Sequence, residues 1–202
     1  MVGLEADVLL MSRPPHPIET DRLTIRPFTA DDADTLQRIQ SKPEIATYLY
    51  WEPRSRDEVI ELLASRIDRP FEEVYRKGFA LAVVVRETNR LIGDVSLTVL
   101  TREHAQGEIG FVLDPDQHGR GYGREAATAV LRLGFVDLDL HRIIGRCDPR
   151  NVPSWRLLER LGMRREAHFR ENEIFKGRWG DEYVYALLAA EWRADSAGIS
   201  RP

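Results

Sequence analysis

The sequence contains one cysteine, Cys147, in 202 residues. One thiol excludes an intramolecular disulfide and is typical of the reducing cytoplasm, where we expect this protein. Cys147 falls in a predicted strand, which favours a buried, inert thiol over a nucleophile. No apolar run is long enough to span a bilayer, so we expect no membrane partner. Residues 1–17 include acidic residues and no basic leader, so we predict a flexible arm and no signal peptide.

The sequence also lacks an excess of basic residues. Its formal net charge of −4 argues against nucleic acid as the main partner. The motifs G-x-x-x-x-G-K-[ST], G-x-S-x-G and H-E-x-x-H are missing, and His104, His141 and His168 are scattered. We therefore expect no nucleotide P-loop, no serine-hydrolase elbow and no metal site. The chain does have 43% apolar and 31% charged residues, which is typical of a globular domain.

Hydrophobic periodicity predicts one α+β domain over residues 18–192, with a mostly antiparallel first half and a frayed tail over 193–202. Two capping boxes, of the Thr-x-x-Asp and Ser-x-x-Glu type, begin the first two helices. Segments 41–53 and 171–180 are predicted loops. The predicted helices are 29–40, 55–68, 123–135 and 153–161, and the predicted strands are 19–28, 79–87, 90–100, 107–113, 142–147, 163–170 and 182–188.

Three closely spaced glycines, Gly119, Gly121 and Gly123, stand between a predicted strand and a predicted helix. The first N–H groups of a helix have no internal partner and lie at the positive end of its dipole, so they attract anions. Glycines let a phosphate approach those groups, and Arg120 and Arg124 add positive charge. A pyrophosphate cradle is therefore favoured over a simple chain reversal. The segment also matches the G-x-G-x-x-A dinucleotide motif, but residues 114–118 separate it from the strand, which weakens that match.

The stretch "GEIGFVLDPDQHGRGYGREAATAVLRLGF" resembles the coenzyme A site of the GNAT N-acyltransferase superfamily, whose signature is [R/Q]-x-x-G-x-[G/A]. The matching residues are His118 to Gly123, with His118 where Arg or Gln is usual. "IETDRLTIRPFTADDAD" resembles the opening of the RimJ/RimL-like branch, the ribosomal-protein N-terminal acetyltransferases. "DPRNVPSWRLLERLGMRREA", with Met163 in place of Phe, and "GRWGDEYVYALLAAEW" resemble later segments of that branch, in the same order.

This resemblance implies a mixed, mostly antiparallel sheet of about seven strands, flanked by helices and with a splayed central strand pair. It also implies transfer of an acyl group, with acetyl expected, from acyl-CoA to a primary amine on a peptide N-terminus or a small molecule. It leaves a homodimer open. By resemblance the coenzyme A-binding residues are Phe111, Val112, Leu113, His118, Gly119, Arg120, Gly121, Tyr122, Gly123, Arg124, Asn151 and Ser154.

The same resemblance suggests two catalytic residues. Glu108 lies where some relatives carry a glutamate that removes a proton from the amine, although it could instead be a surface glutamate at a strand end. Many relatives protonate the leaving thiolate with a tyrosine, but this sequence has Leu158 there, so Ser154 becomes the candidate donor. Water could serve instead, and Asn151 and Ser154 also suit a helix cap. Segments 48–51 and 171–179 are expected to flank the amine pocket.

Three other functions stay open on the sequence. One is an antibiotic-modifying acetyltransferase of the same fold, which clustered carboxylates in the acceptor pocket would favour, whereas an open groove would favour a peptide. A second is a regulator that binds coenzyme A without turnover, which a Glu108 pointing away from the thioester would favour. A dinucleotide-binding oxidoreductase is the most distant reading.

Overall fold

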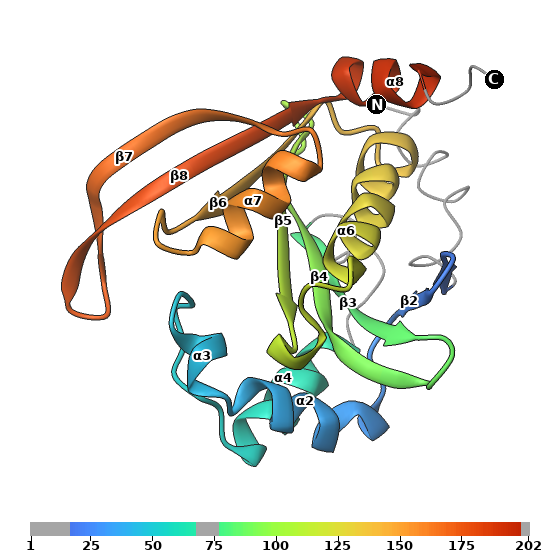
Figure 1. The fold of residues 1–202 in the computed structure, drawn as a ribbon, viewed down its shortest axis with the longest axis vertical. Coiled ribbons are helices and arrows are strands. Elements are labelled where there is room, and N and C mark those ends of the chain that lie inside the picture. Colours follow the sequence, from blue (N-terminus) through green and yellow to red (C-terminus); the bar gives the residue numbers. More distant parts are fainter. Residues whose placement is uncertain (1–16, 68–76, 199–202) are drawn as a thin grey trace.

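The computed structural model describes residues 17–67 and 77–198, so the predicted arm lies almost wholly outside the described residues. Its centre is one sheet with the strand order β1-β2-β3-β4-β5-β6-β8-β7 (Figure 1). The paired neighbours are antiparallel except β5 and β6, which are parallel. The strands are β1 Ile18–Glu19, β2 Leu23–Arg26, β3 Gly78–Val85, β4 Arg90–Thr101, β5 Gln106–Leu113, β6 Arg142–Cys147, β7 Arg164–Phe175 and β8 Arg178–Leu188.

Helices cover both faces of this sheet. Their bounds are η1 Ala30–Asp32, α2 Ala33–Gln40, α3 Pro43–Ala46, α4 Arg56–Ile67, η2 Pro115–Gln117, α6 Tyr122–Arg132, a π-helical turn η3 Leu133–Asp137, α7 Val152–Arg160 and α8 Ala189–Gly198. Both predicted capping boxes are confirmed: the Thr29 N–H donates to Asp32 Oδ2 over 2.8 Å, and the Ser55 N–H donates to Glu58 Oε2 over 2.7 Å. The predicted α+β fold is therefore confirmed, with eight strands where about seven were expected.

Alternation along the strands divides the core into two layers. On β3, Leu81 and Val83 pack in a cluster with α6 and α7, whereas Ala82 and Val84 pack in a second cluster with α2 and α4. Since successive side chains of a strand point to opposite faces, the two helix pairs cover opposite faces of the sheet. We call them the α6/α7 face and the α2/α4 face.

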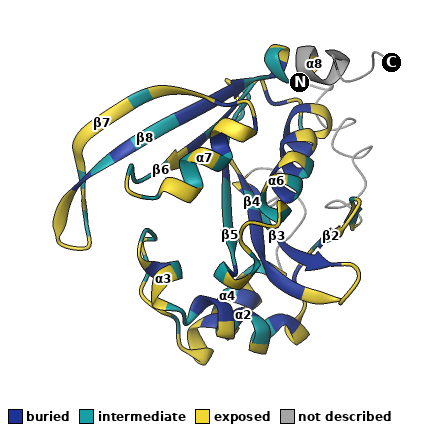
Figure 2. Cartoon of the chain, in the orientation of Figure 1, coloured by how far each residue is buried: buried dark blue, intermediate teal, exposed yellow. Residues whose placement is uncertain are grey.

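Two predicted irregular segments are regular in the structure. The predicted loop 171–180 is the end of β7 and the start of β8, which turn at Lys176 and Gly177, both with positive φ. Most side chains of β7 are exposed (Figure 2), so the hydrophobic alternation that marks a strand is missing there. Residues 193–198 of the predicted frayed tail instead belong to α8, whose first turn is fixed by Glu191 accepting the Leu188 N–H over 2.8 Å, and residues 199–202 lie outside the described residues.

The pair β5–β6 separates part-way along its length. The register joins Gln106, Gly107 and Glu108 of β5 to Arg142, Ile143 and Ile144 of β6, and pairing among the described residues stops there. Beyond Glu108, β5 remains paired with β4 and β6 remains paired with β8. The sheet therefore has an opening between β5 and β6, which confirms the predicted splay. In the described ranges, no helix has the length and apolar character needed to cross a membrane.

Candidate active site at the strand splay

The glycine loop lies on the α6/α7 face, directly before α6. Gly119 and Gly121 have φ of 76° and 81°, a conformation that side-chain-bearing residues rarely adopt. A Cβ on Gly119 would meet nothing within 4 Å, so the loop is open at that point. A Cβ on Gly123 would lie 3.2 Å from both Leu113 Cδ1 and Leu157 Cδ2. The first two glycines therefore shape the loop, and the third lets it pack between β5 and α7.

An ion pair that the sequence did not reveal holds this loop in place. Glu125, on the first turn of α6, accepts hydrogen bonds from Thr20 Oγ1 at 2.6 Å and Arg22 Nε at 2.8 Å. Arg22 Nη1 also donates to the Arg120 carbonyl over 2.9 Å. Burial alone would raise the pKa of the Glu125 carboxyl, but these donors lower it below its ordinary value. The turn between β1 and β2 thus fixes the orientation of the glycine loop.

A buried carboxylate fixes the start of the same loop. Asp114 follows β5 directly, and its side chain is fully buried. It accepts a hydrogen bond from Lys42 Nζ at 2.7 Å, and the guanidinium groups of Arg38 and Arg90 lie 3.5 and 3.3 Å away. Burial acts to raise the pKa of Asp114, yet the Lys42 ammonium and the Asp116 N–H hold it below its usual range. This contact ties the end of β5 to α2.

His118, predicted to bind the coenzyme, is exposed and bonded to the protein itself. Its Nε2 lies 3.1 Å from the carbonyl oxygen of Leu113, the last residue of β5. The imidazole therefore closes the turn between β5 and the glycines. A direct contact between His118 and the coenzyme stays a prediction.

The N-terminus of α7 lies beside the opening on the same face. The Asn151 side chain accepts the Ser154 N–H over 3.3 Å, so the predicted helix cap is confirmed for Asn151. The Ser154 side chain lies beside the Cys147 thiol at the end of β6 and acts to lower its pKa. Burial is the larger cause and raises the pKa of that thiol to about 11, which keeps it protonated and unreactive. Leu158, where many relatives have tyrosine, fills the space over Gly145 of β6, whose Cβ would come within 2.6 Å of it.

On the α2/α4 face, three charged side chains line the opening. Glu108 pairs in register with Ile144, so it shares a face with Arg146, two residues further along β6. Arg146 pairs with Val184, which places Glu182 of β8 on that face too. Arg146 binds Glu108 through two hydrogen bonds of 3.0 and 2.8 Å, and its Nη1 lies 3.9 Å from Glu182 Oε1. The predicted base Glu108 is therefore at the opening and in an ion pair.

The two segments expected to flank the amine pocket contact each other at this face. The Tyr50 hydroxyl donates to Glu173 of β7, and the Tyr50 ring meets Phe175 edge-on at 5.4 Å. Lys176 Nζ donates to the carbonyls of Ala46 and Trp51 over 3.0 and 3.3 Å. We call this set of contacts the hairpin bridge. It brings a third carboxylate, Glu173, to the same region as Glu108 and Glu182.

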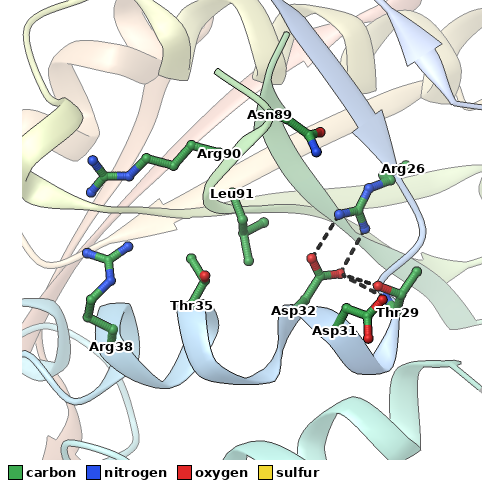
Figure 3. Close-up of a pocket in the computed structure, with 9 residues that line it drawn as sticks. All are labelled: Arg26, Thr29, Asp31, Asp32, Thr35, Arg38, Asn89, Arg90 and Leu91. Carbon is green, nitrogen blue, oxygen red and sulfur yellow. Dashed lines mark hydrogen bonds and ion pairs between the residues drawn. The ribbon is translucent and has the colours of Figure 1, made fainter. Parts of the chain in front are cut away.

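Two cavities lie on or near the α2/α4 face. One of about 810 Å³ lies between η1–α2 and the β3–β4 turn (Figure 3). It contains none of the predicted site residues, and its Arg26 and Asp32 already bind each other through two bonds of 2.8 Å. The other, of about 360 Å³, includes Thr98, which pairs in register with Glu108. Of these two cavities, the smaller lies against β4 beside Glu108, at the closed end of the splay. Within the described residues no group of three or more His, Cys, Asp or Glu is arranged to hold a metal ion.

The sequence resemblance to acyl-transferring enzymes implies a splayed strand pair and a glycine loop before a helix. The structure has both, and it places carboxylates on the opposite face of the opening. Residues 22–164 match the family model "Acetyltransferase (GNAT) domain". The chain therefore belongs to the GNAT acetyltransferase family, and it is an acetyltransferase. The dinucleotide-binding reading of the glycine loop is thereby replaced.

Several relatives support this placement over most of the chain. "Uncharacterized N-acetyltransferase YnaD" of Bacillus subtilis is 34% identical and is matched over 87% of this chain and 98% of its own. "Spermidine N(1)-acetyltransferase" of Vibrio cholerae is 27% identical, with 85% and 95% covered. "Putative ribosomal N-acetyltransferase YdaF" of B. subtilis is 25% identical, with 87% and 96% covered, in agreement with the RimJ/RimL-like branch. A solved GNAT-family acetyltransferase from Bacillus anthracis superimposes with a TM-score of 0.79 at 31% identity, covering 87% of this chain and 100% of that one.

Proposed function

We propose that the protein transfers an acetyl group from acetyl-CoA directly to a primary amine that enters from the α2/α4 face. One observation carries the proposal: the opening between β5 and β6 has the glycine loop and α7 on one face and Glu108, Arg146 and Glu182 on the other. A thioester reaching through the opening meets an amine held by the carboxylates. Coenzyme and acceptor then approach the reacting carbon from opposite sides.

The residues of the α6/α7 face fit coenzyme A. The open, positive-φ loop at Gly119 and Gly121 presents the first N–H groups of α6, which suits a pyrophosphate, with Arg120 and Arg124 beside it. Backbone groups of Phe111 to Leu113, which β6 leaves unpaired, suit the amides of the pantetheine arm, and Asn151 lies at the end of α7 beside it. A free N–H there also suits the thioester oxygen as it gains charge.

The reaction needs one proton removed before the attack. An ammonium has no lone pair, and amines in peptides and side chains have pKa values of ~7.7–10.4, so a carboxylate of the α2/α4 face takes the proton. The sequence points to Glu108 for this step, and Glu182 lies on the same face. The free amine attacks the thioester carbon, the C–S bond breaks, and the sulfur takes a proton from Ser154 or from water.

The acceptor site suits a slender molecule with positive charge. Glu108, Glu173 and Glu182 come from three strands, and the hairpin bridge joins α3 to the β7–β8 turn across the same region. Such an arrangement favours a linear amine or an extended N-terminus over a lysine on a folded surface. The carboxylates also keep a polycationic small molecule as the second candidate, and one relative is named as a spermidine acetyltransferase. We place the reaction in the cytoplasm, and a homodimer stays a prediction.

An acceptor panel tests the proposal. Extended peptides, linear polyamines and an aminoglycoside would each be mixed with acetyl-CoA or succinyl-CoA while thiol release is followed. We expect acetyl-CoA to be used and a linear or peptide amine to be acetylated, with mass spectrometry locating the new amide. Tight acetyl-CoA binding without turnover on every acceptor would instead support a regulator that binds the coenzyme and performs no transfer.

A further inference from the structure

Two glutamates of the α2/α4 face compete for one arginine. Both oxygens of Glu108 accept hydrogen bonds from Arg146, at 3.0 and 2.8 Å, and its side chain is 22% exposed. Glu182 Oε2 accepts one hydrogen bond from Asn172 Nδ2 at 3.2 Å, and its side chain is 11% exposed. Glu182 Oε1 lies 3.9 Å from Arg146, beyond hydrogen-bonding distance, and accepts no hydrogen bond from the described part of the chain. Glu182 thus has one oxygen that accepts no hydrogen bond from the described residues, whereas both oxygens of Glu108 already accept one from Arg146.

The positions of the two residues along the opening differ as well. Glu108 is the last residue of β5 paired with β6, so it lies at the closed end of the splay. Glu182 comes just before Tyr183, the partner of Cys147 at the far end of β6, so it is level with the open end. By register along the strands, a thioester that enters beside Phe111 to Leu113 would therefore lie nearer to Glu182 than to Glu108.

We propose that Glu182, and not Glu108, accepts the proton of the acceptor amine, while Arg146 and Glu108 form a fixed ion pair that positions it. This inference rests on the proposed function, because it assigns a step of that reaction. Glu182 Oε1 takes one proton from the ammonium and becomes a carboxylic acid. The neutral amine then forms the N–C bond, the C–S bond breaks, and the sulfur takes a proton from Ser154 or from water. The second proton that the nitrogen loses as the amide forms restores that donor. Solvent finally removes the proton from Glu182.

The electrostatics agree with this geometry. Burial is the main cause that raises the pKa of the Glu182 carboxyl above its ordinary value; Arg146 opposes it, and the charges of Glu173 and Glu108 add to it. The charge of Glu182 in turn acts to raise the pKa values of Tyr50 and of the Cys147 thiol, so both groups also face it. A base whose pKa is raised toward neutrality holds the abstracted proton better than an ordinary carboxylate.

The test compares Glu182→Gln with Glu108→Gln, and Glu166→Gln is the matched control. Glu166 also pairs with an arginine of β6, Arg142, but at the opposite end of that strand from the opening. At neutral pH we expect Glu182→Gln to lower kcat/KM by ~10²–10⁴-fold and to recover as pH rises toward the pKa of the amine. Glu108→Gln should cost less and keep the wild-type shape of the pH profile, and Glu166→Gln should match wild type.

A second measurement does not depend on turnover. In protein carrying ¹³C-labelled glutamate carboxyls, the resonance lost in Glu182→Gln should titrate above the ordinary range of a glutamate carboxyl. The inference is overturned if that resonance titrates within or below the ordinary range, or if Glu108→Gln alone shows the large, pH-recoverable loss. If wild-type protein acetylates no amine, the proposed function fails separately, and the carboxyl titration still decides whether Glu182 holds its proton more tightly than an ordinary glutamate.

Discussion

The two faces of the opening are built in different ways. We call the α6/α7 side of the opening, where we propose that coenzyme A binds, the coenzyme face; it is made mainly of backbone from the end of β5, the glycine loop and the first turn of α6. We call the α2/α4 side, where we propose that the amine binds, the acceptor face; it is made of side chains from β5, β6, β7, β8 and the segment after α3. A backbone site tolerates changes of sequence as long as its conformation is kept, so a family can share it. A site made of side chains from distant segments can change one residue at a time, which suits a variable acceptor.

The largest effect is expected from a substitution that changes only the coenzyme face. Gly121→Val adds a branched side chain at a φ of 81°, with its Cβ 3.2 Å from Arg22 Nη2, so the loop must shift and move the N–H groups that we propose hold the pyrophosphate. Losing one hydrogen bond to a charged group costs roughly 1.5–3 kcal/mol, so we expect coenzyme A affinity to fall by at least about tenfold to a hundredfold. Calorimetric titration with coenzyme A measures it.

Gly177→Val is the matched control for that change. Gly177 has nearly the same φ, 77°, but lies in the β7–β8 turn, and an added Cβ there meets nothing within 4 Å. Both variants should lose stability through strain at a positive φ, with added crowding against Arg22 in Gly121→Val, but only Gly121→Val should lose coenzyme affinity. Equal affinity in the two folded variants would contradict the phosphate cradle.

The next effect tests the support beneath the coenzyme face. Asp114→Asn keeps the acceptor oxygen for the Asp116 N–H but removes the charge that Lys42, Arg38 and Arg90 share. Breaking a buried ion pair costs ~3–5 kcal/mol, and because these cations are partly exposed we expect the lower end or less. Urea unfolding at neutral pH measures it. Asp116→Asn, which removes an exposed carboxylate from the same Lys42, should change stability little.

The same pair of variants has a predictable pH dependence. The pKa of Asp114 is lower in the folded than in the unfolded protein, so its contribution to stability is full above the ordinary aspartate pKa and is lost as pH falls through the folded value. The stability difference between wild type and Asp114→Asn should therefore shrink in acid. A difference that stays constant from neutral pH to pH 3 would contradict a charge-based role.

The sequence allowed prediction of the parts that depend on local pattern. The glycine loop, both capping boxes and strand 142–147 follow from neighbouring residues, and the resemblance supplied the splay. The hairpin 164–188 was partly missed because its exposed first strand has no apolar alternation. Contacts such as Arg22 with Glu125 and Tyr50 with Glu173 join residues about a hundred or more positions apart, and no local signal links them. Glu182 was missed because its burial depends on the packing of β8 against β6 and β7.

A further prediction concerns the point where the two faces meet. Ser154→Ala removes the hydroxyl beside Cys147 but keeps the backbone N–H that Asn151 caps. If Ser154 supplies a hydrogen bond to the departing sulfur, kcat should fall by about ten- to hundred-fold, with little change in the KM for acetyl-CoA and nearly the same melting temperature. Asn151→Ala should instead lower the melting temperature, because the lost cap costs ~0.5–2 kcal/mol of stability, and should leave kcat nearly unchanged. Unaltered kcat in Ser154→Ala would leave water as the proton source.

The smallest expected effect lies on the acceptor face, at the hairpin bridge. Tyr50→Phe keeps the ring contact with Phe175 and removes only the hydrogen bond to Glu173. Tyr50 is 72% exposed, so the loss of stability should stay within ~1 kcal/mol.

The freed Glu173 carboxylate should then attract a cationic acceptor more strongly, whereas a looser hairpin bridge should weaken the binding of any acceptor. We expect the first effect to dominate for a polyamine, so its KM should fall about two- to threefold, while kcat and coenzyme affinity stay unchanged. Initial rates at saturating acetyl-CoA, with a polyamine and with a neutral monoamine of similar length, separate the two effects. A KM that rises equally for both acceptors would mean that the bridge acts by shape alone and that Glu173 does not recognise charge.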